Sequence, residues 1–193
     1  MDWMSEPGLA RSRGPCNPPA EMSTPNPSDP AGPILRQAVP EDLDRIKPLW
    51  HALYQHQFEH GMLLRLPENA YEAWRQSIVP FLGRFANIVV AELNGEIIAF
   101  VAGRIRTLPP YFGSATIGAI SEVFVSDAHR SARVGRRLLA FALEWFKEQQ
   151  ITRVELQVVA GNPGGIRFYK QLGWHEELLQ MVWDTTRAPQ ADG

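Results

Sequence analysis

A stretch from Val123 to Leu139 combines residue types that could hold a phosphate-bearing ligand. It starts with β-branched and aromatic residues typical of a strand, and from Val134 its apolar positions follow the period of a helix. The first turn of a helix leaves backbone N–H groups without partners and carries partial positive charge, so it attracts anions. The residues gathered around this expected helix start are Arg130, Ser131, Arg133, Gly135, Arg136 and Arg137.

Two explanations of these arginines are compatible with the sequence. Basic side chains are disfavoured at a helix N-terminus unless a strongly negative group binds there, and a pyrophosphate would remove that cost. Alternatively, the arginines form a charged surface that faces solvent. The sequence pattern by itself leaves both explanations open.

Three histidines raise the question of a metal site. His51, His56 and His60 have spacings of five and four residues, and the last two would share one face of a helix. The sequence offers no third ligand to join His56 and His60. The single cysteine, Cys16, excludes an internal disulfide and a cysteine-cluster metal site. We therefore expect no metal.

The composition narrows the class of protein. The length of 193 residues suits one globular domain with a tail. A formal net charge of −2 and a pI near 6.2 do not indicate a nucleic-acid partner. No apolar run approaches the roughly 18–20 residues of a membrane span, and the N-terminus lacks an apolar signal core. These features predict a cytoplasmic protein that does not enter a membrane.

The N-terminal segment, residues 1–33, is rich in Pro, Ser, Gly, Asn and Asp and lacks apolar periodicity, so we expect it to be disordered. It contains two PxxP spacings, which either dock a partner or simply belong to a linker. Met22 is a second candidate for the start of translation. The folded domain is expected over residues 34–187, followed by a C-terminal tail over 188–193.

The hydrophobic periodicity, together with Gly, Pro and Asn residues at turns and helix ends, predicts the elements that position the arginine-rich stretch. Asn94-Gly95 between apolar runs indicates a hairpin, because both positions of its turn need positive φ. Pro48 should kink or split the helix that contains it. The expected elements are strands over 34–39, 87–93, 96–106, 115–125, 152–159 and 178–184, and helices over 40–59, 68–82, 134–150 and 163–172.

The order of these elements predicts a mixed α/β (α+β) fold. The hairpin makes the first half of the sheet antiparallel, and the strand, helix and strand that follow imply one parallel pair. Helices should cover both faces of the sheet. Along the strand that enters the arginine-rich stretch, alternation places Ser121, Val123 and Val125 on one face, and Ile120, Glu122 and Phe124 on the other.

The stretch from Val125 to Leu139, followed by the stretch from Asn162 to Trp174, resembles the GNAT acetyltransferase superfamily. The loop of that family reads Arg/Gln-x-x-Gly-x-Gly/Ala, and here it reads Arg130-Ser-Ala-Arg133-Val-Gly135. If the backbone at Arg133 needs a left-handed conformation, arginine costs about 1–2 kcal/mol there. If glycine only makes room, Arg133 can turn outward toward a phosphate, and we favour this second explanation.

The resemblance implies a GNAT-like mixed sheet and an acetyl-CoA site. In the family, acetyl-CoA lies between two parallel strands that splay apart. Its pantetheine arm pairs with the first strand, and its pyrophosphate rests on the loop and helix start. Asn162 either contacts the arm or closes a turn and caps the next helix. The expected cofactor-binding residues are Val123, Phe124, Val125, Arg130, Ser131, Ala132, Arg133, Val134, Gly135, Arg136, Asn162 and Tyr169.

The resemblance also implies catalytic roles for Tyr169 and Glu122. Family members often use a tyrosine at the position of Tyr169 to protonate the departing thiolate. Alternatively, Tyr169 only packs in the core. Glu122 is the candidate base for the amine proton, or else a surface or paired carboxylate. The Val125 N–H would face the oxyanion if the strand bulges as in the family.

The implied activity is transfer of an acetyl group from acetyl-CoA to a primary amine, by direct attack in a ternary complex. The family builds its acceptor pocket from segments equivalent to residues 51–66 and 108–113, and they leave the choice between small-molecule and peptide amines open. A homodimer is also left open. Two other functions remain: a catalytically idle acyl-CoA-binding regulatory module, and a partner-docking role for the proline-rich tail.

Overall fold

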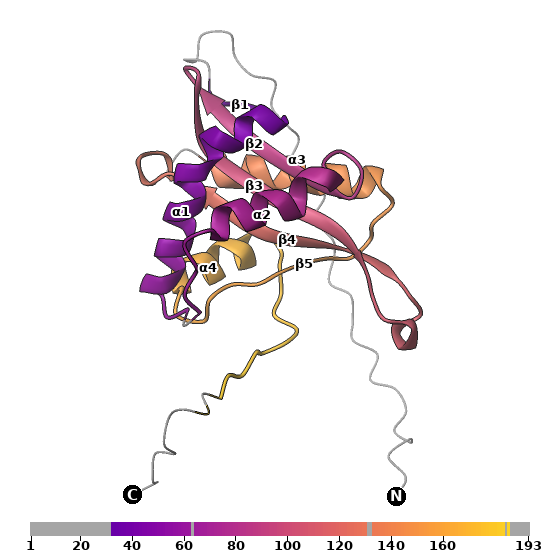
Figure 1. Cartoon of the computed structure of the whole chain (residues 1–193). Coiled ribbons are helices and arrows are strands. Elements are labelled where there is room, and N and C mark those ends of the chain that lie inside the picture. Colours follow the sequence, from indigo (N-terminus) through magenta and orange to yellow (C-terminus); the bar gives the residue numbers. More distant parts are fainter. Residues whose placement is uncertain (1–31, 63, 131–132, 184, 186–193) are drawn as a thin grey trace, which may run out of the picture. The chain divides into compact units, whose positions relative to one another are not determined.

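The computed structural model of the chain describes residues 32–62, 64–130, 133–183 and 185 (Figure 1). Almost all of the expected N-terminal tail, and the whole of the expected C-terminal tail at 188–193, lie outside these residues. Five strands form one sheet in the order β1-β2-β3-β4-β5. The strands are β1 (Ile34–Gln37), β2 (Ala86–Leu93), β3 (Glu96–Thr107), β4 (Thr116–Val125) and β5 (Val154–Leu156).

The sheet is mixed, as the sequence predicted. Neighbouring strands are antiparallel from β1 to β4, and β4 and β5 are parallel. Asn94 and Gly95 have φ values of 52° and 81° in the β2–β3 hairpin, as a tight turn of this kind requires. The helices are α1 (Leu43–Glu59), α2 (Ala70–Ile78), α3 (Val134–Glu148) and α4 (Pro163–Gln171).

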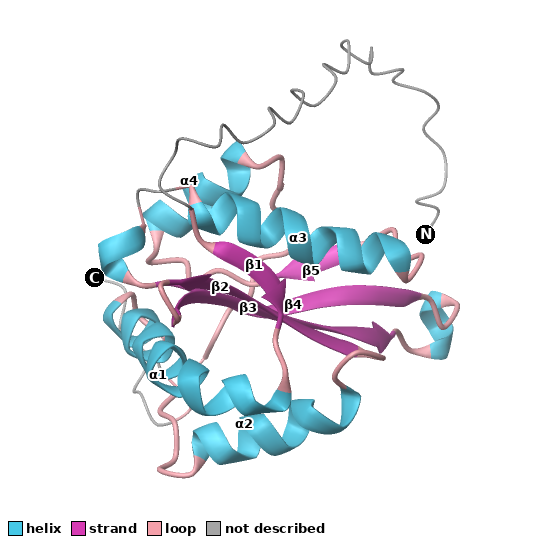
Figure 2. Ribbon diagram, turned by 90° about the horizontal axis from the view of Figure 1, so that it is seen from above, coloured by secondary structure: helices cyan, strands magenta, loops and turns pink. Residues whose placement is uncertain are grey.

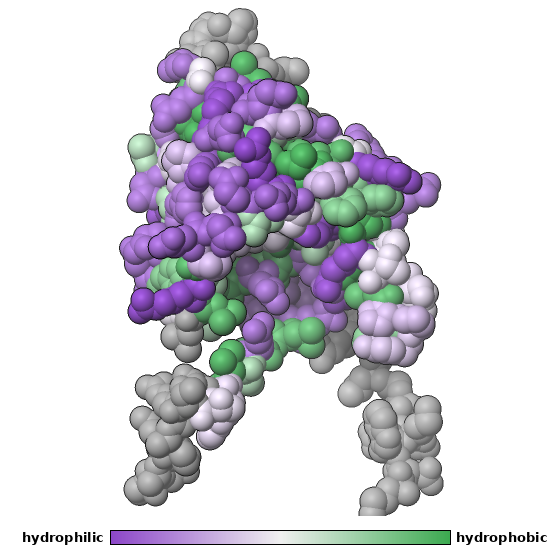
Figure 3. Space-filling view, in the orientation of Figure 1, coloured by the Kyte–Doolittle hydropathy of each residue, from purple (hydrophilic) through white to green (hydrophobic). Residues whose placement is uncertain are grey.

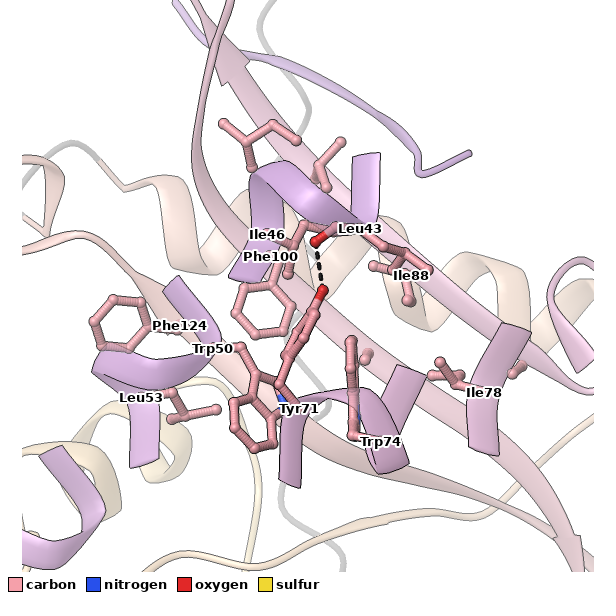
Figure 4. Close-up of a cluster of buried hydrophobic side chains, with 14 residues drawn as sticks. Leu43, Ile46, Trp50, Leu53, Tyr71, Trp74, Ile78, Ile88, Phe100 and Phe124 are labelled. Carbon is pink, nitrogen blue, oxygen red and sulfur yellow. Dashed lines mark hydrogen bonds between the residues drawn. The ribbon is translucent and has the colours of Figure 1, made fainter. Parts of the chain in front are cut away.

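Helices cover both faces of the sheet (Figure 2): α1 and α2 lie on one face, and α3 and α4 on the other. The α1/α2 face holds an aromatic core in which Trp50, Tyr71 and Trp74 pack together, and the Tyr71 hydroxyl donates to the Leu43 carbonyl (Figure 4). The α3/α4 face is largely aliphatic, with Trp145 and Phe146 from α3. In the space-filling view, hydrophilic residues cover much of the surface over α1 (Figure 3).

Pro48 does not split the first helix, contrary to one of the two outcomes that we expected. One helix runs from Leu43 to Glu59 with Pro48 inside it. A proline removes one hydrogen bond of the helix ladder. The apolar stripe that α1 buries against the sheet compensates for that loss; its buried members are Leu43, Ile46, Trp50 and Leu53.

The last expected strand is absent. Residues 175–183 form no strand, and residue 184 lies outside the described part. Leu178 is 91% exposed and Trp183 72% exposed. The alternating apolar pattern predicted a strand, but a strand is stable only when its backbone groups find a partner strand, and none of the described residues pairs with this segment. For the same reason β5 is shorter than the expected 152–159.

A buried carboxylate fastens the start of α1 to the sheet. Asp42 is 3% exposed and accepts hydrogen bonds from Arg36, Arg45 and the Val39 N–H at 2.5–3.0 Å. Both arginines also bind Glu92 of β2. These contacts join β1, β2 and α1, so they fix the helix that carries part of the site described below.

We predict that Asp42→Asn destabilises the fold in a pH-dependent way. The hydrogen bond from Arg36 lowers the pKa of Asp42 to about 2, from a usual value of 3.8. A lowered pKa contributes stability that is present above about pH 4 and is lost as the pH falls toward 2, and the shift corresponds to about 2 kcal/mol. Urea unfolding at neutral pH should show that loss.

The control is Asp44→Asn, because the side chain of Asp44 is 73% exposed and touches one arginine only. It should change the free energy of unfolding by less than about 0.5 kcal/mol. Equal effects of the two substitutions at neutral pH, or an Asp42→Asn effect that persists unchanged at about pH 2, would contradict the structural role of the carboxylate.

Candidate active site

The parallel pairing of β4 with β5 stops half-way along β4. The paired residues of β4 are Gly118 to Ile120 only, opposite Val154 to Leu156. Beyond Ile120, β4 continues to Val125 while pairing with β3 on its other side. We call the side of residues 121–125 that faces away from β3 the open edge of β4. No strand of the described chain pairs with it.

The open edge presents backbone hydrogen-bonding groups at alternate residues. The Ser126 N–H donates to the Ile98 carbonyl at 2.9 Å, so the next pair, Val125 and Ala99, is the kind that exchanges no hydrogen bonds. The N–H and C=O groups of Val125 and Val123 therefore point away from β3. Phe124 has the opposite alternation: its backbone faces β3, and its ring joins the α1/α2 core. A ligand with amide groups could pair with two residues of this edge.

A β-bulge at Ser121 changes which side chains share a face. Ala102 pairs with Glu122 but the next residue of β3, Gly103, pairs with Ile120, so Ser121 is the extra residue. Ile120 consequently packs on the α3 side together with Val123 and Val125. The predicted alternation was wrong for Ile120, since strict alternation cannot anticipate an inserted residue. The bulge lies four residues before Val125, so the expected role of the Val125 N–H does not follow from it.

Glu122 is a buried carboxylate held by donors from α1 and β4. It is 3% exposed, its Oε1 accepts from the Tyr54 hydroxyl at 3.2 Å, and its Oε2 accepts from Ser121. Burial raises its pKa, and the donors Ser121, Trp74 and Tyr54 together with the charge of Arg104 oppose that rise. Glu122 is thus no surface carboxylate, and a raised pKa suits a group that accepts a proton from an amine.

Trp74 acts on Glu122 at longer range than a regular hydrogen bond. Its indole Nε1 is buried and has no partner within hydrogen-bond distance in the described residues. A buried donor without a partner is rare and costly.

The hydroxyl of Tyr54 has a raised pKa. Burial is the main cause and the charge of Glu122 is the second, so the hydroxyl stays protonated and donates to Glu122.

Arg133 adopts the left-handed conformation that we had not favoured. It is the N-cap residue of α3 with φ 56° and ψ 13°. The first of the two explanations above therefore holds: the missing glycine costs about 1–2 kcal/mol of backbone strain. Ser131 and Ala132 lie outside the described residues.

The residues that follow Arg133 begin α3 close to β4 and α4. Val134 is buried, so only its backbone could reach a ligand, whereas Arg136 is exposed. A Cβ atom at Gly135 would lie 3.2 Å from the Phe168 ring and 3.5 Å from Val125. The small residue at 135 thus lets the start of α3 approach both the open edge of β4 and α4.

Arg130 contacts the open edge directly. Its Nε donates to the Val125 carbonyl at 3.3 Å, and its guanidinium forms an ion pair with Asp127 at 2.6 Å. The guanidinium also lies 5.5 Å from the centre of the Phe124 ring. Its side chain is 45% exposed, so these contacts are weak enough for a negatively charged ligand to replace them.

Asn162 and Tyr169 lie on the α4 side of the site. The Asn162 side chain accepts from the Gly165 N–H at 2.8 Å, so its helix-capping role is confirmed. Tyr169 packs edge-to-face against Phe168 and Trp174. Its hydroxyl makes no hydrogen bond to another described residue, and burial raises its pKa to about 12. A protonated, unengaged hydroxyl is available as a proton donor.

The expected histidine pair exists, but the described chain contains no group of three or more metal-ligating side chains. The rings of His56 and His60 stack with centres 4.2 Å apart, and the His60 ring bonds the His56 carbonyl. Among the helices described here, none combines the length and the apolar character needed to cross a membrane.

The sequence pattern that defines the acetyltransferase (GNAT) family matches residues 44–174. The chain belongs to this family. Among curated proteins it is similar to the uncharacterized N-acetyltransferase MJ1207 of Methanocaldococcus jannaschii, with 33% identity over 94 residues, 49% of this chain and 41% of that protein. It thus spans less than half of that relative. An uncharacterized N-acetyltransferase of Archaeoglobus fulgidus is 28% identical over 136 residues, 70% of this chain and 88% of that protein.

Solved structures confirm the GNAT fold. The BH1408 protein of Bacillus halodurans, solved as a tetramutant, has a TM-score of 0.66 and 22% identity, covering 78% of this chain and 99% of that one. The aminoglycoside N-acetyltransferase AAC(6')-Iy in complex with CoA has a TM-score of 0.64 and 18% identity, covering 81% of this chain and 97% of that one. An aminoglycoside acetyltransferase from a soil metagenome, in complex with sisomicin, has a TM-score of 0.59 and 15% identity, covering 79% of this chain and 95% of that one.

The sequence pattern indicated no role in the site for Tyr54 or Trp74, which the fold brings to Glu122. Alternation placed Ser121 on the opposite face from Glu122, whereas the Ser121 hydroxyl donates to that carboxylate. Tyr54 lies within the stretch expected to build the acceptor pocket, and its place beside Leu53 on the inner side of α1 was the available signal. Contact between residues that are 68 positions apart cannot be read from periodicity.

We predict that Arg133→Gly stabilises the protein by about 1 kcal/mol, because glycine adopts positive φ without steric cost. The measurement is the urea midpoint at constant m-value. Arg136→Gly is the matched control: it removes the same charge from an ordinary helical position and should destabilise by about 1 kcal/mol. Destabilisation by both substitutions would contradict strain at Arg133.

Proposed function

We propose that this chain is an N-acetyltransferase that moves the acetyl group of acetyl-CoA to a primary amine by direct attack in a ternary complex. The observation that carries the proposal is the open edge of β4, where Val123 and Val125 offer backbone groups beside the N-terminus of α3. A strand edge beside an anion-attracting helix start matches a ligand that has amides at one end and a diphosphate at the other.

The two ends of the cofactor have separate binding groups. The amides of the pantetheine arm pair with Val123 and Val125, and Asn162 at the N-terminus of α4 contacts the same arm. The pyrophosphate accepts hydrogen bonds from the first N–H groups of α3, including those of Val134 and Gly135. The guanidinium groups of Arg130, Arg133 and Arg136 add charge-assisted hydrogen bonds, for which their fork geometry is suited.

The chemistry is a nucleophilic substitution at the thioester carbon. The neutral amine attacks the carbonyl, a C–N bond forms, and an N–H group of the open edge stabilises the oxyanion. Glu122 accepts the proton that the amine loses, directly or through water. The C–S bond then breaks, and Tyr169 gives its proton to the CoA thiolate. The products are the acetylated amine and CoA.

A second candidate function is a catalytically idle module that binds acyl-CoA. Arg133 in place of the loop glycine motivates it, because a strained residue at the pyrophosphate loop could have been retained for binding rather than turnover. Acetyl-CoA binding without turnover of any amine distinguishes this module from the enzyme.

We predict that Tyr169→Phe lowers kcat by about 10²-fold or more, because the departing thiolate loses its proton donor. Acetyl-CoA affinity, measured by titration calorimetry, should stay within about twofold, since the ring packing is retained. Thiol release with a panel of amines gives kcat. Trp183→Phe, at an aromatic residue that is 72% exposed and outside the proposed site, is the control and should match the wild type. Absence of heat with every CoA species would overturn the proposed function.

We further predict that Glu122→Gln removes the acidic limb of the pH profile of kcat/KM. Because burial raises the pKa of Glu122, the carboxylate is protonated at a higher pH than an exposed one, and the rate should fall as the pH drops through that value. At its optimal pH, the variant should have a kcat/KM about 10²-fold lower than that of the wild type. Glu144→Gln, on the exposed face of α3, is the control. A glutamine variant with the wild-type profile would exclude Glu122 as the base.

A further inference from the structure

Arg104 lies on the same face of the sheet as Glu122. It follows Ala102, the partner of Glu122, by two residues along β3. Ala102 belongs to the α1/α2 core, whereas a Cβ at Gly103 would meet Phe146 of α3, so alternation places Arg104 on the α1/α2 side. Diagonal neighbours of adjacent strands are roughly 7–8 Å apart, within reach of a long side chain.

Arg104 lines an open hollow at the end of α2. Phe81 and Phe85 contribute apolar surface there and are 49% and 44% exposed. Ser77, which also lines the hollow, follows Trp74 by one helical turn along α2. The residues that line it are Ser77, Phe81, Phe85, Ala86, Arg104 and Ile105.

The guanidinium of Arg104 has no carboxylate within 4.0 Å among the described residues. Its neighbour on the same face of β3, Arg106, is paired with Glu155 at 2.6 Å. The charge of Arg104 acts on Glu122 from beyond ion-pair distance, so no carboxylate of the described residues binds its guanidinium directly. A partly buried cation beside apolar rings is costly unless an anion binds it. A carboxylate on a ligand supplies that anion and fits the planar guanidinium with two parallel hydrogen bonds.

We propose that Arg104 selects acceptor amines that also carry a carboxylate, which makes amino acids with an apolar side chain the substrate class. This rests on the proposed function. The carboxylate binds Arg104, the apolar group lies between Phe81 and Phe85, and the amine points toward Glu122. The same positive charge disfavours polycations such as the aminoglycosides, which distinguishes this chain from the similar structures named above.

The test compares L-phenylalanine with L-phenylalaninamide, which lacks the carboxylate. The ratio of their kcat/KM values in the thiol-release assay should fall at least about tenfold from wild type to Arg104→Gln, because only the first substrate loses an ion pair. The two amines have different pKa values, but this difference affects the wild type and the variant equally. It therefore cancels when their ratios are compared. Arg106→Gln is the matched control and should leave the ratio unchanged. An unchanged acetyl-CoA affinity shows that each variant is folded.

A binding measurement separates this inference from the proposed function. Each amine is titrated by calorimetry into the CoA-saturated protein. If no amine is acetylated, the proposed function fails, and a phenylalanine affinity that drops about tenfold or more in Arg104→Gln, with the amide unaffected, still supports the role of Arg104. If the wild type does not bind phenylalanine, or if the substitution changes both amines equally, the inference is overturned.

Discussion

The structure depends on a strand that is paired along its whole length on one side and only along part of its length on the other. Backbone N–H and C=O groups in a sheet need partners, and β5 supplies them to β4 only as far as Ile120. Beyond that point Val123 and Val125 keep polar groups that face away from β3. An extended ligand with amides can complete this edge, and the proposed cofactor site depends on this incomplete pairing.

The sheet also separates the two groups that we propose for proton transfer. On one face, α1 and α2 surround Glu122 with Tyr54 and Trp74, and the ion pairs of Asp42 fix the start of α1. On the other face, α3 presents its N-terminus and α4 presents Tyr169. The proposed proton acceptor, Glu122, and the proposed proton donor, Tyr169, thus lie on opposite faces, and the open edge of β4 lies between them. This arrangement suits a reaction in which one proton leaves the amine and another reaches the thiolate.

Local signals in the sequence were sufficient for much of this fold. The Asn94-Gly95 turn, the change of period at Val134 and the Pro163 helix start all depend on near neighbours, and the structure confirms them. The predictions that were wrong concern features that depend on distant parts of the chain. The bulge at Ser121 arises from register with β3, the αL backbone of Arg133 from the junction of loop and helix, and the missing last strand from the lack of a pairing partner.

Amide hydrogen exchange at the open edge, with and without acetyl-CoA, tests the central claim most directly. Without the cofactor, the Val123 and Val125 amides should exchange much faster than Val101, which is buried in the middle of β3. Saturating acetyl-CoA should slow both amides by about tenfold or more and leave Val101 unchanged. If both amides are already protected without the cofactor, or if acetyl-CoA binds without slowing them, the open edge is not the cofactor site.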